Sequence, residues 1–431
     1  MTTELFRFTQ WANGQPQKRF TALMGLLAAP EGLADSYHRQ PSRKAVGVDG
    51  TDKAEYGQQL GANLADLSAR LKRMGYRPKP SRRVYIPKSS GQGQRPIGIP
   101  CFEDRIVEDR LSRILQAIWE PEFRDCSYGF RPDRSAHQAL ARLDHIITTE
   151  RTQWVYEADV KNFFGSVSHE HMMRFIEHRV GDSNLLRLIR RFLKAGVMDA
   201  GVFNASEQGT PQGNLVSPVL SNTYLHYTLD EWFERRFARQ CQGKAYLVRF
   251  ADDFVACFEF ETDARTFERS LTERLQSFGL EIEPTKTALL RFGDLAPILC
   301  KRDGLKRPRT FSFLGFSHYM RVWRNGRIVL SRKTEAVRVR RKLTEFGRRL
   351  KSMRTAGARA MQMFTLRHWQ GHLQYFGVRG NSRSISAYAH WVQRLLFKWI
   401  NRRSQRRSFN WKRFCAWLAT WFPRAAIVHR L

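Results

Sequence analysis

Two adjacent aspartates, Asp252 and Asp253, interrupt a stretch of sequence that otherwise favours β-strands. Apolar residues precede them at 246–248 and follow them at 254–258, which predicts two short strands joined by a tight turn. Asp is a good turn former, so a bare Asp-Asp pair most often marks only a solvated hairpin. The pair still constrains the fold, because it predicts antiparallel strands with two charges at their junction.

A third acid, Asp159, ends a predicted buried strand at 154–159. An aspartate at a strand end, beside a hairpin that carries Asp-Asp, can gather oxygen ligands around a hard cation. Mg²⁺ suits this arrangement, because it takes few carboxylates and completes its octahedron with waters and substrate phosphates.

The charge of the chain points to a polyanionic partner. Lys and Arg number 73 against 40 Asp and Glu, a net charge of +33. Residues 321–431 hold 27 of these bases and only two acids, Glu335 and Glu345, for a local net of +25. This excess argues against an ordinary enzyme of small neutral substrates and favours nucleic acid or an acidic membrane surface.

Other features of the sequence suggest a cytoplasmic protein without a membrane span. No run of 18 apolar residues is present, and the N-terminus lacks the basic and apolar regions of a signal peptide. The six cysteines contain no Cys-x-x-Cys pair, which fits a reducing compartment.

The predicted secondary structure is α+β, with antiparallel pairs at its centre. A hairpin is expected from strands at 82–87 and 95–100, and helices are expected at 60–71, 107–118, 135–147, 183–196, 219–237 and 262–278. In the basic tail, Leu343, Phe346, Leu350 and Met353 form the apolar stripe of an amphipathic helix, which we expect to pack on the body of the protein.

Several motifs together resemble the reverse transcriptases, and specifically the bacterial group II intron branch. They are the Asp-x-x-x-Phe-Phe strand end at 159–164, the run Thr-Pro-Gln-Gly-Asn-Leu-Val-Ser-Pro at 210–218, the Phe-Ala-Asp-Asp hairpin, the paired segments 83–88 and 95–100, Tyr-Gly-Phe-Arg-Pro at 128–132 and Phe-Leu-Gly-Phe at 313–316. The resemblance runs from about residue 45 to the C-terminus. The chain departs from the family pattern at Phe250, where a Tyr is usual, and at Gly165, where relatives often have Asp.

The resemblance implies a right-hand polymerase fold with fingers, an antiparallel palm and a basic helical thumb, or maturase X domain. The expected divisions are an N-terminal extension and the start of the fingers at 1–80, fingers at 81–150, a palm at 151–320 and the thumb at 321–431. Within the palm range, an alternative is that residues 165–210 belong to the fingers.

The resemblance also implies the catalytic residues. Asp159, Asp252 and Asp253 would hold two Mg²⁺ ions, with help from the carbonyl of Val160 and with Mn²⁺ as a substitute. Two such ions would activate a primer 3′-hydroxyl and stabilise the pyrophosphate leaving group.

Further residues are matched to binding of the incoming deoxynucleotide. They are Lys88, Arg95, Phe164, Gln212, Gly213 and Lys286. Phe164 would crowd a ribose 2′-hydroxyl; the alternative is a simple core aromatic, a role for which Phe163 is the better candidate. The alternative for Lys88, Arg95 and Lys286 is a solvated surface charge, and without the family match it would be the better interpretation of Lys88 and Arg95.

The basic tail is expected to hold nucleic acid by its backbone. The candidate contacts are Arg379, Arg383, Arg402, Arg403, Arg406 and Arg407. A membrane-surface helix is the alternative, disfavoured because the tail aromatics are spread through several segments.

The predicted function is that of an RNA-directed DNA polymerase that also binds group II intron RNA, assists splicing and supports retrohoming. Its partners would be an RNA template, a DNA primer, a DNA target and dNTPs, with a homodimer left open. No His- or Cys-based nuclease motif follows the tail, so an existing primer would be needed. The alternatives are a free-standing relative recruited to DNA repair or antiphage defence, and a non-enzymatic RNA-binding splicing cofactor.

Overall fold

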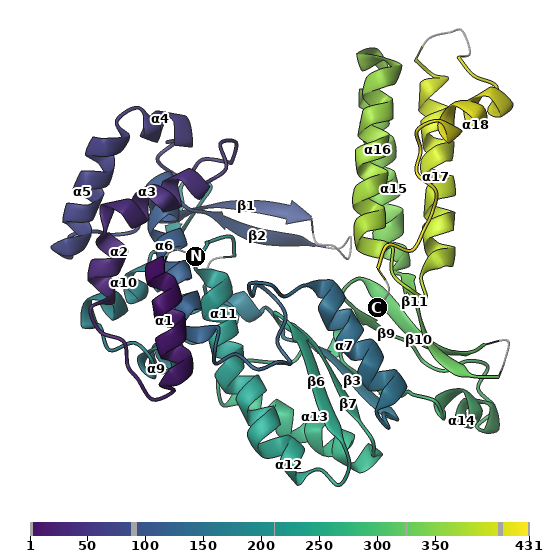
Figure 1. Ribbon diagram of the computed structural model, residues 1–431, viewed down its shortest axis with the longest axis horizontal. Helices are drawn as coiled ribbons and strands as arrows, with labels where there is room; N and C mark the ends of the chain where they lie inside the picture. Colours follow the sequence, from purple (N-terminus) through teal and green to yellow (C-terminus); the bar gives the residue numbers. More distant parts are fainter. Residues whose placement is uncertain (1–2, 88–92, 211, 324–325, 404–407, 430–431) are drawn as a thin grey trace.

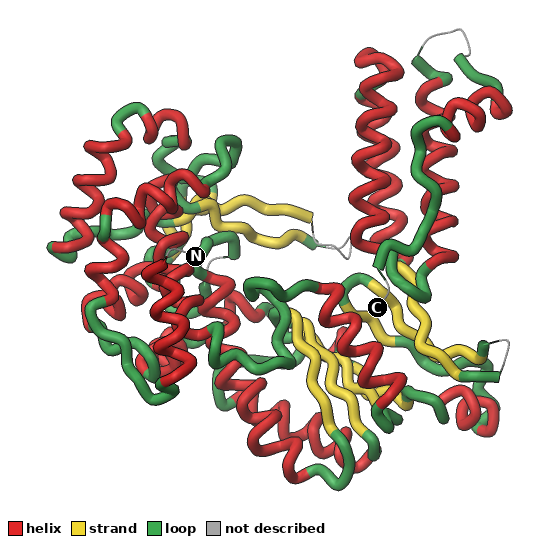
Figure 2. Tube along the Cα trace, viewed as in Figure 1, coloured by secondary structure: helices red, strands yellow, loops and turns green. Residues whose placement is uncertain are grey.

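The computed structural model describes residues 3–87, 93–210, 212–323, 326–403 and 408–429. Within these ranges it is an α+β protein, as predicted: a helical body at one end, strands in the middle and an upright set of helices at the other end (Figure 2).

The N-terminal body is built around one long buried helix, α6 (Phe102–Trp119), whose inner stripe includes Val107, Leu111 and Ile118. Around it lie α1 (Thr3–Gly14), α2 (Leu23–Ala28), α3 (Pro30–Arg39), α4 (Lys53–Gly57) and α5 (Leu60–Lys72).

A four-stranded sheet projects from this body. Strands β1 (Ser81–Pro87) and β2 (Gln94–Ile99) form the predicted hairpin, and the sheet continues through β4 (Val197–Asp199) to β5 (Val202–Asn204). Strand β4 runs parallel to β1, so chain segments more than 100 residues apart meet in one sheet. The hairpin points toward the C-terminal helices (Figure 1).

The central sheet has the order β6-β7-β3-β8, with every neighbouring pair antiparallel. Its strands are β3 (Trp154–Asp159), β6 (Ala245–Phe250), β7 (Asp253–Phe258) and β8 (Ala288–Arg291). Alternate residues face two different cores: one face packs with α13 (Glu261–Gln276) and the other with α7 (Ala136–Thr149). Both faces are therefore buried, and the ends of the strands remain to carry polar groups.

Helices between β3 and β6 link this sheet to the N-terminal body. They are α8 (Phe163–Ser166), α9 (His169–Glu177), α10 (Ser183–Leu193), α11 (Ser217–Leu225) and α12 (Ala238–Gln240). The helix predicted at 219–237 is present, but it contains two π-helical segments, η1 (His226–Asp230) and η2 (Phe233–Phe237). Apolar periodicity does not distinguish these segments from an α-helix.

The short helix η3 (Pro284–Lys286) precedes β8, and after the central sheet the chain forms the short helix α14 (Ala296–Arg302) and a second antiparallel sheet. Its strands are β9 (Phe311–Phe313), β10 (Phe316–Val322) and β11 (Ile328–Thr334).

The C-terminal helices pack mainly on one another. They are α15 (Ala336–Ser352), η4 (Arg354–Ala356), α16 (Gly357–Phe376), α17 (Ser382–Ile400) and α18 (Trp411–Ala419). The predicted stripe on α15 exists, with Phe346 and Leu350 buried and Leu343 and Met353 half-buried. The expectation that it packs on the body is wrong, because these residues join a separate core formed with α16, α17 and α18.

None of the helices in the described part of the chain is both long enough and apolar enough to cross a membrane.

Asp182 joins two elements of the N-terminal body and gives a test of the fold. Its carboxylate caps α10 by accepting hydrogen bonds from the backbone of Asn184 and Leu185, and it also accepts one from Met24 in α2 at 2.8 Å. We expect Asp182→Ala to lower the free energy of unfolding by about 2 kcal/mol, because it leaves buried N–H groups unpaired. Asp52, which caps α4 at an exposed site, is the matched control. Urea unfolding should show a smaller loss for Asp52→Ala, and equal losses would contradict this account.

Candidate active site

The predicted carboxylate hairpin exists and is tighter than expected. Strand β6 continues to Phe250 and β7 begins at Asp253, so that Ala251 and Asp252 alone form the turn. Ala251 has a φ of 57°, in the left-handed region that two-residue hairpin turns require. This conformation is uncommon for a residue with a side chain, and the surrounding contacts must maintain it.

Strand pairing brings the third acid to the same place. In the β3–β7 ladder, Asp159 is the direct partner of Asp253. Because side chains alternate along a strand, directly opposed residues point to the same face of the sheet. The register thus places the Asp159 and Asp253 side chains beside each other, with Asp252 in the adjoining turn.

This crowding of carboxylates is electrostatically unfavourable. Burial raises the pKa of Asp253 well above its ordinary value, and repulsion from Asp159 and Asp252 adds to the rise. Burial, followed by the charge of Asp159, also raises the pKa of Asp252. A hydrogen bond from the backbone of Leu314, in the β9–β10 turn, partly offsets the effect at Asp253. A divalent cation would relieve the same repulsion.

Two basic residues act on these carboxylates. Lys286 Nζ is ion-paired and hydrogen-bonded to Asp159 Oδ2. Partial burial lowers the pKa of Lys286, but the contact with Asp159 outweighs it and the net shift is upward. Arg95, exposed on β2, acts on Asp252 through its charge and favours the ionised carboxylate.

The carboxylates of Asp159, Asp252 and Asp253 are the kind of oxygen ligand that a hard divalent cation prefers, but their side chains do not surround a common point. Among the residues that the structure describes, no three His, Cys, Asp or Glu side chains are grouped closely enough to hold a metal ion. One oxygen of the Asp159 carboxylate, Oδ2, contacts Lys286. Val160 is 2% exposed and forms an isolated β-bridge with Ile282.

The predicted Gln212 and Gly213 lie against the β1–β2 hairpin. The carbonyl of Gln212 accepts a hydrogen bond from the backbone of Gly98 in β2 at 2.6 Å. Gly213 has a φ of 115°, and a Cβ atom there would lie 2.4 Å from the carbonyl oxygen of Gly98. This loop therefore requires glycine, both for its conformation and for its close contact with β2.

Phe163 and Phe164 occupy different environments. Phe163 is 2% exposed and belongs to the core, as expected. Phe164 is half-buried, and its carbonyl accepts a hydrogen bond from Thr210 at the start of the Gln212 loop. Lys88 lies outside the described residues.

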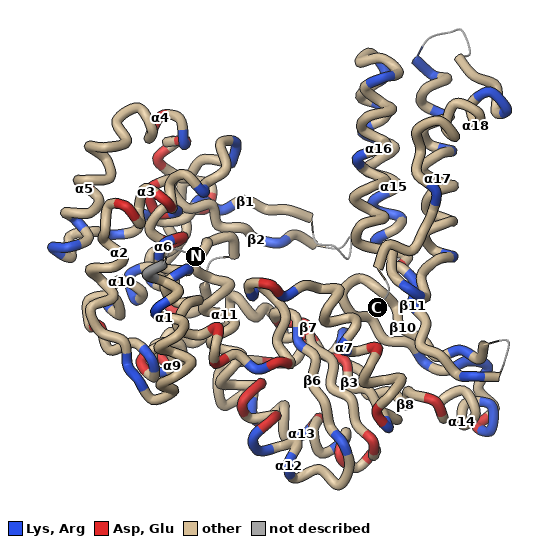
Figure 3. The backbone as a smooth tube through the Cα atoms, in the orientation of Figure 1, with Lys and Arg blue, Asp and Glu red and all other residues tan. Residues whose placement is uncertain are grey.

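The tail arginines do not form a single cluster. Arg379 and Arg383 are exposed near the start of α17, whereas Arg402 and Arg403 lie beyond its end. At 1.5 Å per residue, the 19 residues of α17 separate the two pairs by about 28 Å. Arg403 also bonds to its own chain, at Ile400 and Ser408. Arg406 and Arg407 lie outside the described residues. Lys and Arg recur along the C-terminal helices and near the β10–β11 hairpin (Figure 3).

One group of residues at the site was not found from the sequence. Arg249 directly precedes the hairpin motif, and its buried guanidinium contacts Asp230, Asn222, Ser127 and the carbonyl of Ala251. The signal in the sequence was a basic residue between the predicted strand at 246–248 and the two acids.

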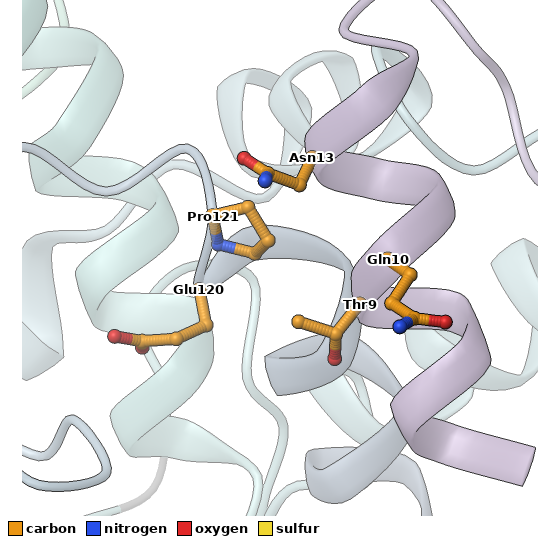
Figure 4. Close-up of a pocket in the computed structure, with 5 residues that line it drawn as sticks. All are labelled: Thr9, Gln10, Asn13, Glu120 and Pro121. Carbon is orange, nitrogen blue, oxygen red and sulfur yellow. The ribbon is translucent and has the colours of Figure 1, made fainter.

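A shallow pocket elsewhere on the molecule has no relation to this site. It lies between α1 and the end of α6 and is lined by Thr9, Gln10, Asn13, Glu120 and Pro121 (Figure 4). Its one charged group, Glu120, points away from α1 and is paired with Arg131 at 2.8 Å.

An antiparallel sheet with helices behind it, a carboxylate hairpin and a third carboxylate on the neighbouring strand define a right-hand polymerase fold. Residues 86–318, more than half of the chain, match the family model described as reverse transcriptase (RNA-dependent DNA polymerase). The chain therefore belongs to the reverse transcriptase family.

Two curated relatives illustrate the similarity. The chain is 37% identical to Protein YkfC of Escherichia coli over 56% of this chain and 63% of that protein. It is 35% identical to the group II intron-encoded protein LtrA of Lactococcus lactis over 48% of this chain and 34% of that protein. The matched segments thus span between about a third and two thirds of the length of these relatives. The match to a solved telomerase from Candida albicans covers 85% of this chain and 65% of that chain, at 12% identity and a TM-score of 0.45.

The raised carboxylate pKa values predict how the metal-free protein responds to pH. A carboxyl group whose pKa is higher in the folded state than in the unfolded state makes the fold less stable as pH rises from its ordinary value through the raised one. Asp253→Asn removes this charge, so we expect the variant to have a higher unfolding temperature than the wild type at pH 8 in a chelator, with a smaller difference at pH 4. Asp125, whose side chain is 94% exposed, supplies the control variant Asp125→Asn, which should change little. A destabilised Asp253→Asn at pH 8 would contradict the electrostatic account.

Proposed function

We propose that this protein is an RNA-directed DNA polymerase that adds deoxynucleotides to a primer 3′-hydroxyl. The observation that carries the proposal is the register that sets Asp159 beside Asp253 and next to Asp252, within a segment that matches the reverse transcriptase family. In this reading, residues 81–150 are fingers, 151–320 are the palm, with 165–210 returning in part to the fingers, and 321–431 are the thumb.

Asp159, Asp252 and Asp253 would hold two Mg²⁺ ions, with the carbonyl of Val160 as a further oxygen ligand. Bound ions would supply Lewis-acid activation of the primer hydroxyl and charge stabilisation at the leaving pyrophosphate. The high pKa values of Asp252 and Asp253 mean that protons compete with the metal, so metal affinity should increase with pH.

The nucleotide would lie between the carboxylates and the β1–β2 hairpin. Arg95 and Lys286 offer positive charge for its phosphates. The charge of each residue acts on the carboxylates beside which the nucleotide would lie. Gln212 and Gly213 would line its sugar, and Phe164 would restrict the space at the 2′ position. Lys88 is proposed as a further phosphate contact on the basis of the family motif.

We propose that the C-terminal helices hold the primer–template duplex and intron RNA. Their exposed arginines, including Arg379, Arg383 and Arg402, suit sequence-independent contacts with phosphates. The similarity to an intron-encoded protein supports a role in splicing and retrohoming.

The first test removes single carboxylates. Asp252→Asn and Asp253→Asn should each reduce Mg²⁺-dependent primer extension on an RNA template below detection, because each removes a metal ligand. Affinity for primer–template should stay at the wild-type value, since no phosphate contact is lost. Asp303→Asn, on the exposed end of α14, is the control and should extend primers normally. Wild-type extension by either hairpin variant would show that the metal site is misassigned.

The second test concerns the choice of sugar. Phe164→Val should increase ribonucleotide incorporation relative to deoxynucleotide incorporation, because a smaller side chain leaves room for a 2′-hydroxyl. Phe163→Val is the matched control. The ring of Phe163 lies in the core, so this variant should be less stable than the wild type but should keep its sugar preference. Single-nucleotide incorporation assays measure both. An unchanged preference in folded, active Phe164→Val would leave Phe164 as a packing residue.

A further inference from the structure

The turn that carries Asp252 and Asp253 rests on a buried ion pair. The side chains of Arg249 and Asp230 are both 0% exposed. Arg249 Nε donates to Asp230 Oδ1 at 2.7 Å, and Nη2 donates to Oδ2 at 2.5 Å, which is the bidentate geometry of a strong arginine–carboxylate contact. A fully buried ion pair is weak evidence for added stability, because desolvating both charges offsets their attraction. Its place beneath the catalytic turn therefore suggests another role.

The guanidinium of Arg249 uses its five N–H donors fully. Besides the two bonds to Asp230, Nη1 donates to the carbonyl of Ala251 at 3.0 Å and to Asn222 Oδ1 at 3.1 Å, and Nη2 donates to Ser127 Oγ at 2.8 Å. The partners come from the turn itself, from α11, from η1 and from the loop after α6. One side chain thus ties the turn to the loop after α6 and to two places on the continuous α11–η1 helix.

The bond to Ala251 acts on the strained residue of the turn. Ala251 has the left-handed backbone conformation, and its carbonyl belongs to the peptide unit that leads into Asp252. The loop after α6 also contacts the backbone beside the turn: Tyr128 donates its backbone N–H to the carbonyl of Arg249 at 2.9 Å. Gly129 lies so close that a Cβ atom there would be 2.4 Å from the nitrogen of Ala251. These contacts hold the turn where carboxylate repulsion would otherwise favour its opening.

We propose that Arg249 is a positioning residue, which together with Asp230 holds the Ala251–Asp252 turn in the one conformation that lets Asp252 and Asp253 share a divalent cation with Asp159. The inference rests on the proposed polymerase function and adds residues that touch neither the substrate nor the metal. A lysine at 249 would keep the charge, but its compact ammonium cannot reach Asp230, Asn222 and the Ala251 carbonyl together.

The test is Arg249→Lys in the full chain, with primer extension measured across a Mg²⁺ titration. We expect the Mg²⁺ concentration for half-maximal rate to rise about 10–100-fold, as for other residues that orient metal ligands, with unchanged primer–template affinity. Arg332→Lys is the matched control. Arg332 is a buried arginine, 1% exposed, paired with Asp144 at 2.8 Å between β11 and α7. That variant should unfold at a lower temperature and keep the wild-type Mg²⁺ requirement.

A wild-type Mg²⁺ requirement in Arg249→Lys would overturn the proposal, and so would equal shifts in both variants, which would indicate a general loss of stability. If Arg249→Lys does not fold, Asp230→Asn is the second variant. It keeps the shape of the side chain and one acceptor oxygen, and it should also raise the Mg²⁺ requirement.

If the wild type extends no primer, the proposed function fails, and the inference is then tested separately by Mn²⁺ binding, measured by electron paramagnetic resonance. Weaker Mn²⁺ binding in both Arg249→Lys and Asp253→Asn would support it, and unchanged binding in Arg249→Lys would overturn it.

Discussion

Repulsion among three carboxylates is the constraint that the rest of this structure satisfies. Asp159 and Asp253 are direct neighbours in a ladder of backbone hydrogen bonds, and Asp252 adjoins them in a two-residue turn. Such an arrangement persists only if the strands cannot slip, because a shift of one residue would move each side chain to the opposite face. The two cores on either side of the central sheet prevent this slip, since both faces of β3 and β7 are filled with apolar side chains.

Local patterns in the sequence were enough to locate the strands of the site. The apolar runs around Asp252 and before Asp159 each lie within a few residues, so periodicity and turn chemistry predicted β3, β6 and β7 with small errors at their ends. The motifs then singled out three of the 40 acids as candidate metal ligands. The hairpin strands β1 and β2 were predictable for the same reason.

Features that depend on distant segments were not predictable in this way. Asp230 lies 19 residues before Arg249, in a π-helical segment that apolar spacing does not reveal. Strands β4 and β5 are three residues each; β4 pairs with β1, far away in the sequence, and β5 pairs with β4. The stripe on α15 shows a related limit: periodicity identified its apolar face, but only the packing of α16 and α17 shows what covers that face. Likewise, Arg379 and Arg383 were grouped with Arg402 and Arg403 as candidate contacts, although α17 separates the two pairs.

The C-terminal helices have two different attachments to the rest of the molecule. Their upper parts share a core of their own, whereas Phe376 and Val378 at the base belong to the core beneath the central sheet. Between the two, the fully buried Asn381 bonds to the backbone and hydroxyl of Thr334 and to the carbonyl of Phe376. Buried polar contacts of Asn381 thus lie where two separate apolar cores meet. The upper helices therefore depend on apolar contacts that the sheet carrying the carboxylates does not share.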